Sequence, residues 1–302
     1  MVTFEEIIQE KDKTKRDQLI KNKLDELNAT TEPVYVDTEH NVTGFISNRS
    51  KVEVSNTIWG IDDNVYNEEY SMKADDYFYE FFDFLIEHNI TTKSDAITHI
   101  SSFLKSYFNV RGGAKHDRDS VFEYLHEYLK DFYKKYPDKF NWENNNALDI
   151  GSFKNLSAAE CCEHACTGQN LLTICDVASC YVVGKLSVLG KAPECHAYNI
   201  IKYNNEFFLL DISNPANLYE VRDHHYEFVG CNSPLIRISR NDLIEFMSGK
   251  SKLETHLLEY VRVPNSEKNK LISCKECIYT ATGKPLNKEA LDEFCSGEAK
   301  AI

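Results

Sequence analysis

The sequence predicts an α+β fold, in which a helical N-terminal half precedes a helix that packs on an antiparallel sheet. Apolar residues recur at helical spacing in three segments between residues 77 and 132. A cysteine-rich segment with the pattern of a helix then begins near residue 157, and strand-like runs follow it up to residue 212. The 302-residue chain is 42% hydrophobic, enough apolar material for one large core or two smaller ones.

The pattern divides the chain into three parts. Residues 1–70 are expected to form a helix and a small β layer, and residues 266–302 a polar, peripheral tail. Residues 71–265 are expected to form the main domain, with a helical part at 71–140 and a core at 150–215.

In the first part, residues up to about Leu27 alternate in charge, as on an exposed helix. Between Val34 and Ile61, the runs VYV, TGFI, VEV and TIWGI are separated by Asn, Asp and Gly. Short β-type runs with such separators favour strands joined by turns.

Three helices are expected in the helical part, each with a stripe of large apolar side chains. The stripes are Tyr77, Phe78, Phe81, Phe82 and Leu85; Ile97, Ile100, Leu104 and Phe108; and Val121, Leu125, Tyr128, Leu129 and Phe132. Ser94 and Asp119 favour the start of the second and third helices, and NVRGGAK separates these two helices. Such stripes are typical of buried helix faces rather than of cofactor sites.

Three strand-like runs follow the cysteine-rich segment: 180-CYVVGKLSVL-189, 196-HAYNIIKY-203 and 206-EFFLLDI-212. Asn204 and Asn205 tolerate left-handed conformations, so they predict a tight hairpin between the last two runs. In that hairpin, the numbers of facing residues would sum to about 409. This register brings the carboxylate of Asp211 near an imidazole at His196.

The segment 160-ECCEHACTGQNLL-172 contains three cysteines and one histidine within seven positions. With Ser157 as the N-cap, Cys161 would lie in the first turn of a helix, where free N–H groups and the helix dipole favour a thiolate. Cys161 would share a small and apolar face with Ala165, Gly168, Leu172 and Cys175, suited to close packing on a sheet. The face of Cys162, Cys166, Gln169 and Thr173 is more polar and is expected to point away from the strands. These expectations favour Cys161 over Cys162 as a nucleophile.

A metal site is the alternative interpretation of the same cysteines. On a helix, Cys161 and His164 lie on diverging faces, so the four side chains of CCxHxC cannot converge on one ion. A pair at 274-CKEC-277 has no second CxxC motif to complete a zinc site. The sequence contains no EF-hand-like loop that would predict a calcium site. The sequence therefore predicts reduced thiols and no metal or cofactor.

Three motifs, 161-CCEHA-165, 196-HAYN-199 and 209-LLDIS-213, resemble the catalytic core of the transglutaminase-like superfamily, a papain-like fold with a Cys-His-Asp triad. The segment 171-LLTICDVASCYVVG-184 also resembles the end of that family's nucleophile helix and the strand after it. The resemblance covers roughly Ser157 to Pro215. The chain departs from the family pattern in three positions: Asp176 replaces a turn glycine, Cys180 a common arginine, and Tyr198 a more frequent tryptophan.

The resemblance implies acyl transfer at an amide, with Cys161 as nucleophile, His196 as general base and acid, and Asp211 as the residue that orients the imidazole. The backbone N–H of Cys161 would stabilise the oxyanion, with Trp142 or Gln169 as candidates for a second donor. The substrate would be a protein or peptide. A protease or amidase is favoured over a cross-linking transglutaminase, because no feature promises exclusion of water from the acyl-enzyme. A deamidase, which also transfers the acyl group to water, stays open.

Other interpretations stay open at this point. A catalytically silent transglutaminase-like binding module would keep the fold without turnover. Cys161 and His196 could be ordinary buried residues, and Asp211 a turn cap. His164 is expected on the helix surface or behind the catalytic residues, and the pair 224-HH-225 in a loop.

The formal net charge of −14 argues against nucleic acid or an anionic membrane surface as a partner, because phosphates repel an acidic protein. The opening MVTFEEIIQEKDKTKRDQLI contains no continuous apolar stretch, and no later run has the length of a membrane span. We therefore expect a cytoplasmic protein, or an effector exported without a leader. The oligomeric state is left open.

Overall fold

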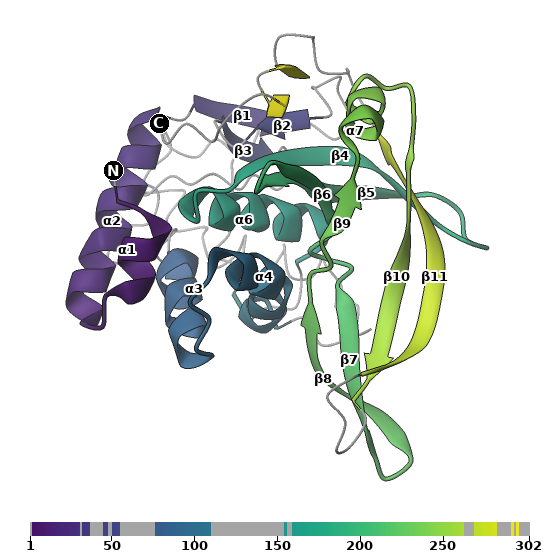
Figure 1. Ribbon diagram of the computed structural model, residues 1–302, viewed down its shortest axis with the longest axis horizontal. Helices are drawn as coiled ribbons and strands as arrows, with labels where there is room; N and C mark the ends of the chain where they lie inside the picture. The colour runs from purple at the N-terminus through teal and green to yellow at the C-terminus, as the bar shows by residue number, and fades with distance from the viewer. Residues whose placement is uncertain are drawn as a thin grey trace, which may run out of the picture.

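The computed structural model describes residues 2–30, 32–36, 45–47, 50–54, 76–109, 154–155, 159–262, 269–282, 291–292 and 294–295. These residues form a mixed α+β fold, with helices in the N-terminal half and a curled, largely antiparallel sheet after them (Figure 1). The α+β class expected from the sequence is confirmed. The expected helix around residues 121–132 and the run TIWGI lie outside the described residues.

The helices are α1 (Phe4–Gln9), α2 (Lys13–Thr30), α3 (Asp76–Glu87), α4 (Lys93–Tyr107), α6 (Cys161–Ile174) and α7 (Arg240–Met247). The strands are β1 (Glu32–Val36), β2 (Phe45–Ser47), β3 (Ser50–Val54), β4 (Ala178–Val188), β5 (Glu194–Tyr203), β6 (Glu206–Leu210), β7 (Ala216–Arg222), β8 (His225–Asn232), β9 (Ile236–Ile238), β10 (Leu253–Val261) and β11 (Lys270–Ala281).

The N-terminal segment forms two helices that are partly buried, so the single exposed helix expected there was wrong. Phe4, Ile7 and Ile20 have no exposed surface. Phe4 and Ile7 are three residues apart and share one face of α1, which packs into the core with α3. The sequence did not indicate this burial, because charged residues separate the few apolar residues of the stripe.

Part of the expected small β layer is present among the described residues. Strands β1 and β3 pair in parallel, from Glu32 opposite Ser50 to Val36 opposite Val54. Strand β2 instead joins the main sheet, because Phe45 to Ser47 pair antiparallel with β4.

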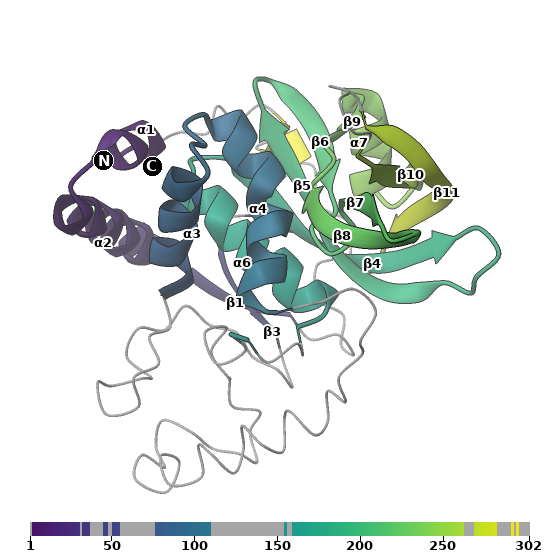
Figure 2. The same cartoon turned by 90° about the horizontal axis from the view of Figure 1, so that it is seen from below.

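The aromatic stripes of α3 and α4 are buried as predicted. All nine side chains expected in these two stripes belong to one core, which also contains residues of α6 and of the sheet face beneath it. Figure 2 shows α3 and α4 lying across α6. Helix α4 begins at Lys93 with Thr92 as its N-cap, two residues before the expected cap Ser94. The Thr92 hydroxyl accepts the Asp95 N–H at 3.1 Å.

In the described residues, the main sheet has the order β8-β7-β10-β11-β4-β5-β6-β9. Strands β5 and β6 form the predicted hairpin, with Asn199 opposite Leu210, so the facing numbers sum to 409. Asn204 and Asn205 have φ of 50° and 61°, the left-handed values that a two-residue turn between strands requires. The register expected from the sequence is therefore confirmed.

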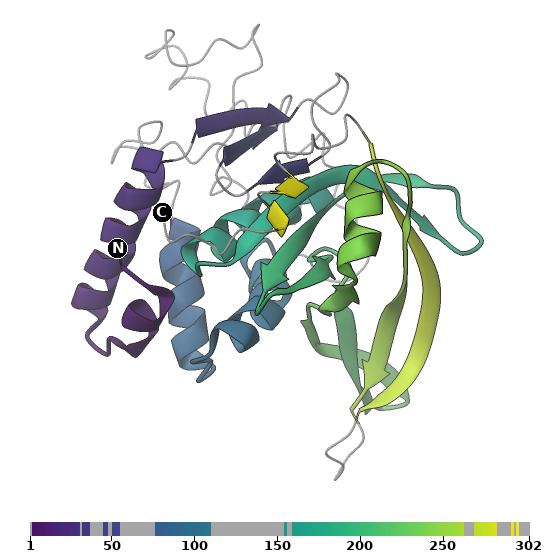
Figure 3. The ribbon, with the colours of Figure 1, turned by 45° about the horizontal axis from the view of Figure 1, so that its top comes forward.

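The C-terminal segment is not a peripheral tail throughout, contrary to expectation. Strand β11 lies between β10 and β4 and pairs with both. Its Cys277 and Tyr279 belong to a second core, which α7 covers from the side opposite to α6 (Figure 3). The segment suggested a tail because its first half is largely exposed, and only Cys277 and Tyr279 of this strand are buried.

Asp176 turns the chain between α6 and β4 with a left-handed φ of 56°, as a glycine there would. Its carboxylate also accepts the backbone N–H of Phe4 at 3.1 Å and forms an ion pair with the buried Lys23. The aspartate thus ties the N-terminal helices to the turn, which a glycine could not do.

Gly184 is required by the close approach of β4 and β11. A Cβ at this position would lie 1.7 Å from the backbone oxygen of Thr280, and the strands cannot separate without losing their pairing. We expect Gly184→Ala to lower the free energy of unfolding by about 3 kcal/mol in urea denaturation. Gly230→Ala is the matched control, since no heavy atom lies within 4 Å of a Cβ there. Equal midpoints for the two variants would contradict this packing.

Candidate active site

Cys161 is the first residue of α6, so it lies at the helix end where free N–H groups favour an anion. The N-cap is Glu160, not Ser157 as expected, and its N–H donates to Glu163 Oε2 at 2.6 Å. The N-cap is three residues later than expected, and Cys161 still lies in the first turn, as predicted.

The small face of α6 packs closely on the sheet, as predicted. The backbone oxygen of Ala165 accepts a hydrogen bond from Asn199 Nδ2 at 3.1 Å. A Cβ at Gly168 would lie 1.9 Å from the Ile212 side chain. This contact fixes the segment after β6, in which Ile212 follows Asp211.

The neighbouring face of α6 does not point away from the strands, which corrects the expectation. Gln169 Oε1 accepts the Ser179 hydroxyl at 2.8 Å and Asn199 Nδ2 at 3.3 Å. Nearly the whole of α6 is buried between α4 and the sheet, so two of its faces meet strands. Facing alone therefore does not separate Cys161 from Cys162.

His196 and Asp211 lie together at one end of the β5–β6 hairpin. His196 Nε2 lies 2.8 Å from Asp211 Oδ2, and the two residues are 8% and 1% exposed. Since Nε2 is engaged by the carboxylate, Nδ1 is the ring nitrogen left to serve a thiol. The structure thus brings the predicted histidine and aspartate together.

Cys161, the first residue of the helix that packs on β5, lies close enough to His196 for the two groups to influence each other's ionisation. Hydrogen bonds from Cys162 and His196, together with the His196 charge, outweigh burial and lower the pKa of Cys161 to about 4. The Cys162 thiol has one hydrogen, and Glu163 Oε1 lies 3.1 Å away as a competing acceptor. When the Cys162 thiol donates to Glu163, it cannot stabilise the Cys161 thiolate, so we regard His196 as the main group that does.

The pKa values of His196 and Asp211 are shifted so that both charged forms are favoured. Burial disfavours a charged His196, but Asp211 and then Cys161 raise its pKa to about 10. Burial also disfavours an ionised Asp211, but His196, Tyr279 and Asn214 lower its pKa to about 2. A thiolate, an imidazolium and a carboxylate can therefore coexist near neutral pH.

Sequence reasoning missed the groups that hold Asp211. Its Oδ2 accepts the Tyr279 hydroxyl at 2.6 Å and Asn214 Nδ2 at 3.0 Å, and its Oδ1 accepts the Ser213 hydroxyl at 3.0 Å and the Asn214 N–H at 3.1 Å. Asn214 was within reach of prediction, because aspartate side chains often accept hydrogen bonds from backbone groups a few residues ahead in a turn. Tyr279 was not, because it is 68 residues away on a strand whose pairing is non-local.

Two aromatic rings enclose the imidazole. Tyr198 is stacked on the His196 ring with a centroid distance of 5.9 Å, and Tyr279 lies 6.0 Å away at 52°. The Tyr198 hydroxyl donates to the backbone oxygen of Thr280 rather than to the triad. Tyr198, two residues after the histidine, therefore shields one face of the imidazole from water.

The remaining candidates take other places. His164 is buried against Phe108, and its Nδ1 lies 2.7 Å from the backbone oxygen of Glu160. Burial lowers the pKa of this histidine, which is not on the helix surface. Gln169 lies about 12 Å along the helix from Cys161, too far to donate to the same oxyanion. Trp142 lies outside the described residues.

His224 has a left-handed φ of 67° in the turn between β7 and β8, and His225 begins β8.

All ten cysteines are free thiols. In the described part of the chain, no group of three or more His, Cys, Asp or Glu side chains could hold a metal ion. None of the helices formed by the described residues combines the length and apolar character that a membrane crossing requires.

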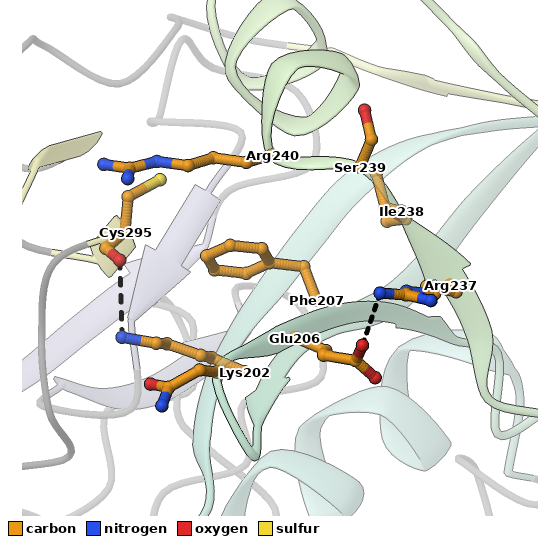
Figure 4. A pocket seen from close by; sticks show the side chains of 9 residues that line it. Lys202, Glu206, Phe207, Arg237, Ile238, Ser239, Arg240 and Cys295 are labelled. Carbon is orange, nitrogen blue, oxygen red and sulfur yellow. Dashed lines mark hydrogen bonds and ion pairs between the residues drawn. The ribbon is translucent and has the colours of Figure 1, made fainter.

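A pocket of about 580 Å³ lies at the other end of the β5–β6 hairpin (Figure 4). It is lined by Lys202, Asn205, Glu206, Phe207, Arg237, Ile238, Ser239, Arg240 and Cys295. Lys202 Nζ donates to the backbone oxygen of Cys295 at 3.3 Å, and Arg237 pairs with Glu206. Lys202 is six residues from His196 along β5, about 20 Å. The pocket is therefore separate from the triad.

Comparisons with models of known protein families, with curated proteins and with solved structures find no match to this chain.

Proposed function

We propose that the chain is a cysteine-dependent acyl-transfer enzyme that acts on amide bonds, in the first place a protease or amidase. The observation that carries this proposal is the buried pair of His196 and Asp211, 2.8 Å apart, beside the helix that begins at Cys161 and packs on β5. A buried thiolate and imidazolium are a costly arrangement for a purely structural role, and perturbed groups of this kind gather at active sites.

The proposed reaction begins with attack of the Cys161 thiolate on the amide carbonyl carbon, which forms a carbon–sulfur bond and places the carbonyl electron pair on oxygen. The Cys161 N–H at the helix start stabilises this oxyanion. When the oxyanion collapses, the carbon–nitrogen bond breaks and His196 Nδ1 gives its proton to the departing amine. Water, deprotonated by His196, then cleaves the thioester and restores the thiolate and imidazolium.

We also propose that α6 and strands β4 to β6 form a papain-like transglutaminase core. Three placements support this reading: the cysteine opens the helix, the histidine lies near the start of β5, and the aspartate follows β6. The motifs that resemble the family fall on these same elements. A protein or peptide substrate follows from this proposal.

The experiment is a screen of amide turnover as a function of pH. Activity requires the thiolate, so it should rise with pH through about 4, and it requires the imidazolium, so it should fall as pH passes about 10. We would follow cleavage of fluorogenic peptide amides, ammonia release from glutamine peptides, and incorporation of a labelled amine. Cleavage with this bell-shaped profile supports the protease or amidase. No turnover of any of the three, with Cys161 ionised, would overturn the proposal in favour of a silent binding module.

A further inference from the structure

Tyr279 and the candidate base His196 both form hydrogen bonds with the same oxygen atom of Asp211. Its hydroxyl donates to Asp211 Oδ2 at 2.6 Å, and His196 Nε2 lies 2.8 Å from the same oxygen. Asn214 Nδ2 is a third donor, at 3.0 Å. A carboxylate has about four acceptor positions over its two oxygens, so three donors on one oxygen compete for its electron density.

The other carboxylate oxygen keeps the group in place without Tyr279. Oδ1 accepts the Ser213 hydroxyl at 3.0 Å and the Asn214 N–H at 3.1 Å. Loss of the Tyr279 hydroxyl should therefore leave the carboxylate plane where it is. What changes is the negative charge that Oδ2 can direct at His196, which grows when the shortest of its three hydrogen bonds is removed.

Resting on the proposed function, we propose that Tyr279 is a positioning residue that, by taking part of the charge of Asp211 Oδ2, keeps the His196 imidazolium able to release its proton to the leaving amine. An imidazolium held too tightly by its carboxylate would be a poor acid at that step. Strand β11, which sequence reasoning placed in a peripheral tail, thereby belongs to the catalytic centre. Tyr279 itself contacts neither Cys161 nor the reacting carbonyl in this scheme.

The titratable groups around His196, Asp211 and Tyr198 are Cys161 from α6, Cys180 from β4, and Cys277 and Tyr279 from β11. Burial raises the pKa of Tyr279, so its hydroxyl stays a donor throughout the working range. Burial also raises the pKa of Cys277. The pKa values of Cys161 and His196, about 4 and about 10, bound the interval over which the thiolate and the imidazolium coexist.

The test is the pH profile of iodoacetamide alkylation at Cys161, read by peptide mass spectrometry in the intact chain. In the wild type, the rate should rise as Cys161 ionises and change again when His196 loses its proton. Tyr279→Phe should move this second step up by about half a pH unit, a threefold tighter hold on the proton. Tyr198→Phe is the matched control. Its ring is stacked on the same imidazole, but the hydroxyl that the change removes donates to the backbone oxygen of Thr280 and not to Asp211.

The inference would be overturned if the pH of the second step is unchanged or lower in Tyr279→Phe, or if it moves equally in Tyr198→Phe. Buried Cys166 and Cys175 report folding in the same digest, since they should stay unlabelled. If Tyr279→Phe does not fold, Asn214→Ala removes another donor from Oδ2 and should also raise the step; a lower step would reject the charge sharing. A wild type without fast alkylation at low pH would instead overturn the proposed function itself, and this inference with it.

Discussion

Replacing His196 by alanine is expected to slow the alkylation of Cys161 by iodoacetamide at pH 5 by about 30- to 100-fold. The imidazolium is the positive charge beside a thiol that is otherwise largely buried. Without it, burial disfavours the thiolate, and the pKa of Cys161 should return from about 4 toward its ordinary value of 9.0.

The size of this effect follows from two opposing changes. At pH 5, the thiolate fraction falls by about 10⁴ when the pKa rises by five units. The more basic thiolate is also the better nucleophile, which returns a factor of about 10² to 10^2.5. The loss of thiolate is the larger change, so the alkylation rate should fall by about 30- to 100-fold.

Cys195 provides an internal control for this measurement. It is exposed and directly precedes His196 in the chain, so its alkylation rate should be the same in the wild type and in His196→Ala. An unchanged rate at Cys161 would mean that the histidine does not stabilise the thiolate. A loss of rate at both cysteines would point to a general disturbance of the β5 strand instead.

The part of the site that could be predicted is the part that local sequence determines. Asn204 and Asn205 fix the hairpin turn, and the turn fixes the register that brings Asp211 to His196. Helical spacing likewise identified the buried faces of α3 and α4. In each case, residues close in sequence carry the whole signal.

The rest depends on contacts between distant segments. Strand β11 enters the sheet between β10 and β4, and nothing in its polar surface indicates that Tyr279 will meet Asp211. The polar face of α6 was expected to point away from the strands, but Gln169 forms hydrogen bonds with Ser179 and Asn199 of the sheet. Burial of polar groups becomes visible only when their partners are known.

The first residue of α6 also shows how far a local rule reaches. Ser157 is the better N-cap by preference, but the helix begins after Glu160, whose N–H is held by Glu163. The predicted location of Cys161 in the first turn survived this error. Its location beside the strand that carries His196 comes from the packing of α6 on β5, which the small residues Ala165 and Gly168 allow.

Cys161→Ala is expected to abolish acyl transfer, with a loss of turnover of at least about 10³-fold, because no other group can form the thioester. Cys162→Ala is the matched control. It removes the neighbouring thiol of the same helix turn and should keep turnover within about tenfold, since His196 still holds the thiolate.

The most direct measurement of this claim is to trap the acyl-enzyme. The protein would be mixed with an activated peptide ester, quenched in acid, digested and analysed by mass spectrometry. The account predicts a hydroxylamine-sensitive acyl group on Cys161 in the wild type and in Cys162→Ala, and none in Cys161→Ala. An acyl group on Cys162, or equal acylation of the Cys161→Ala variant, would contradict it.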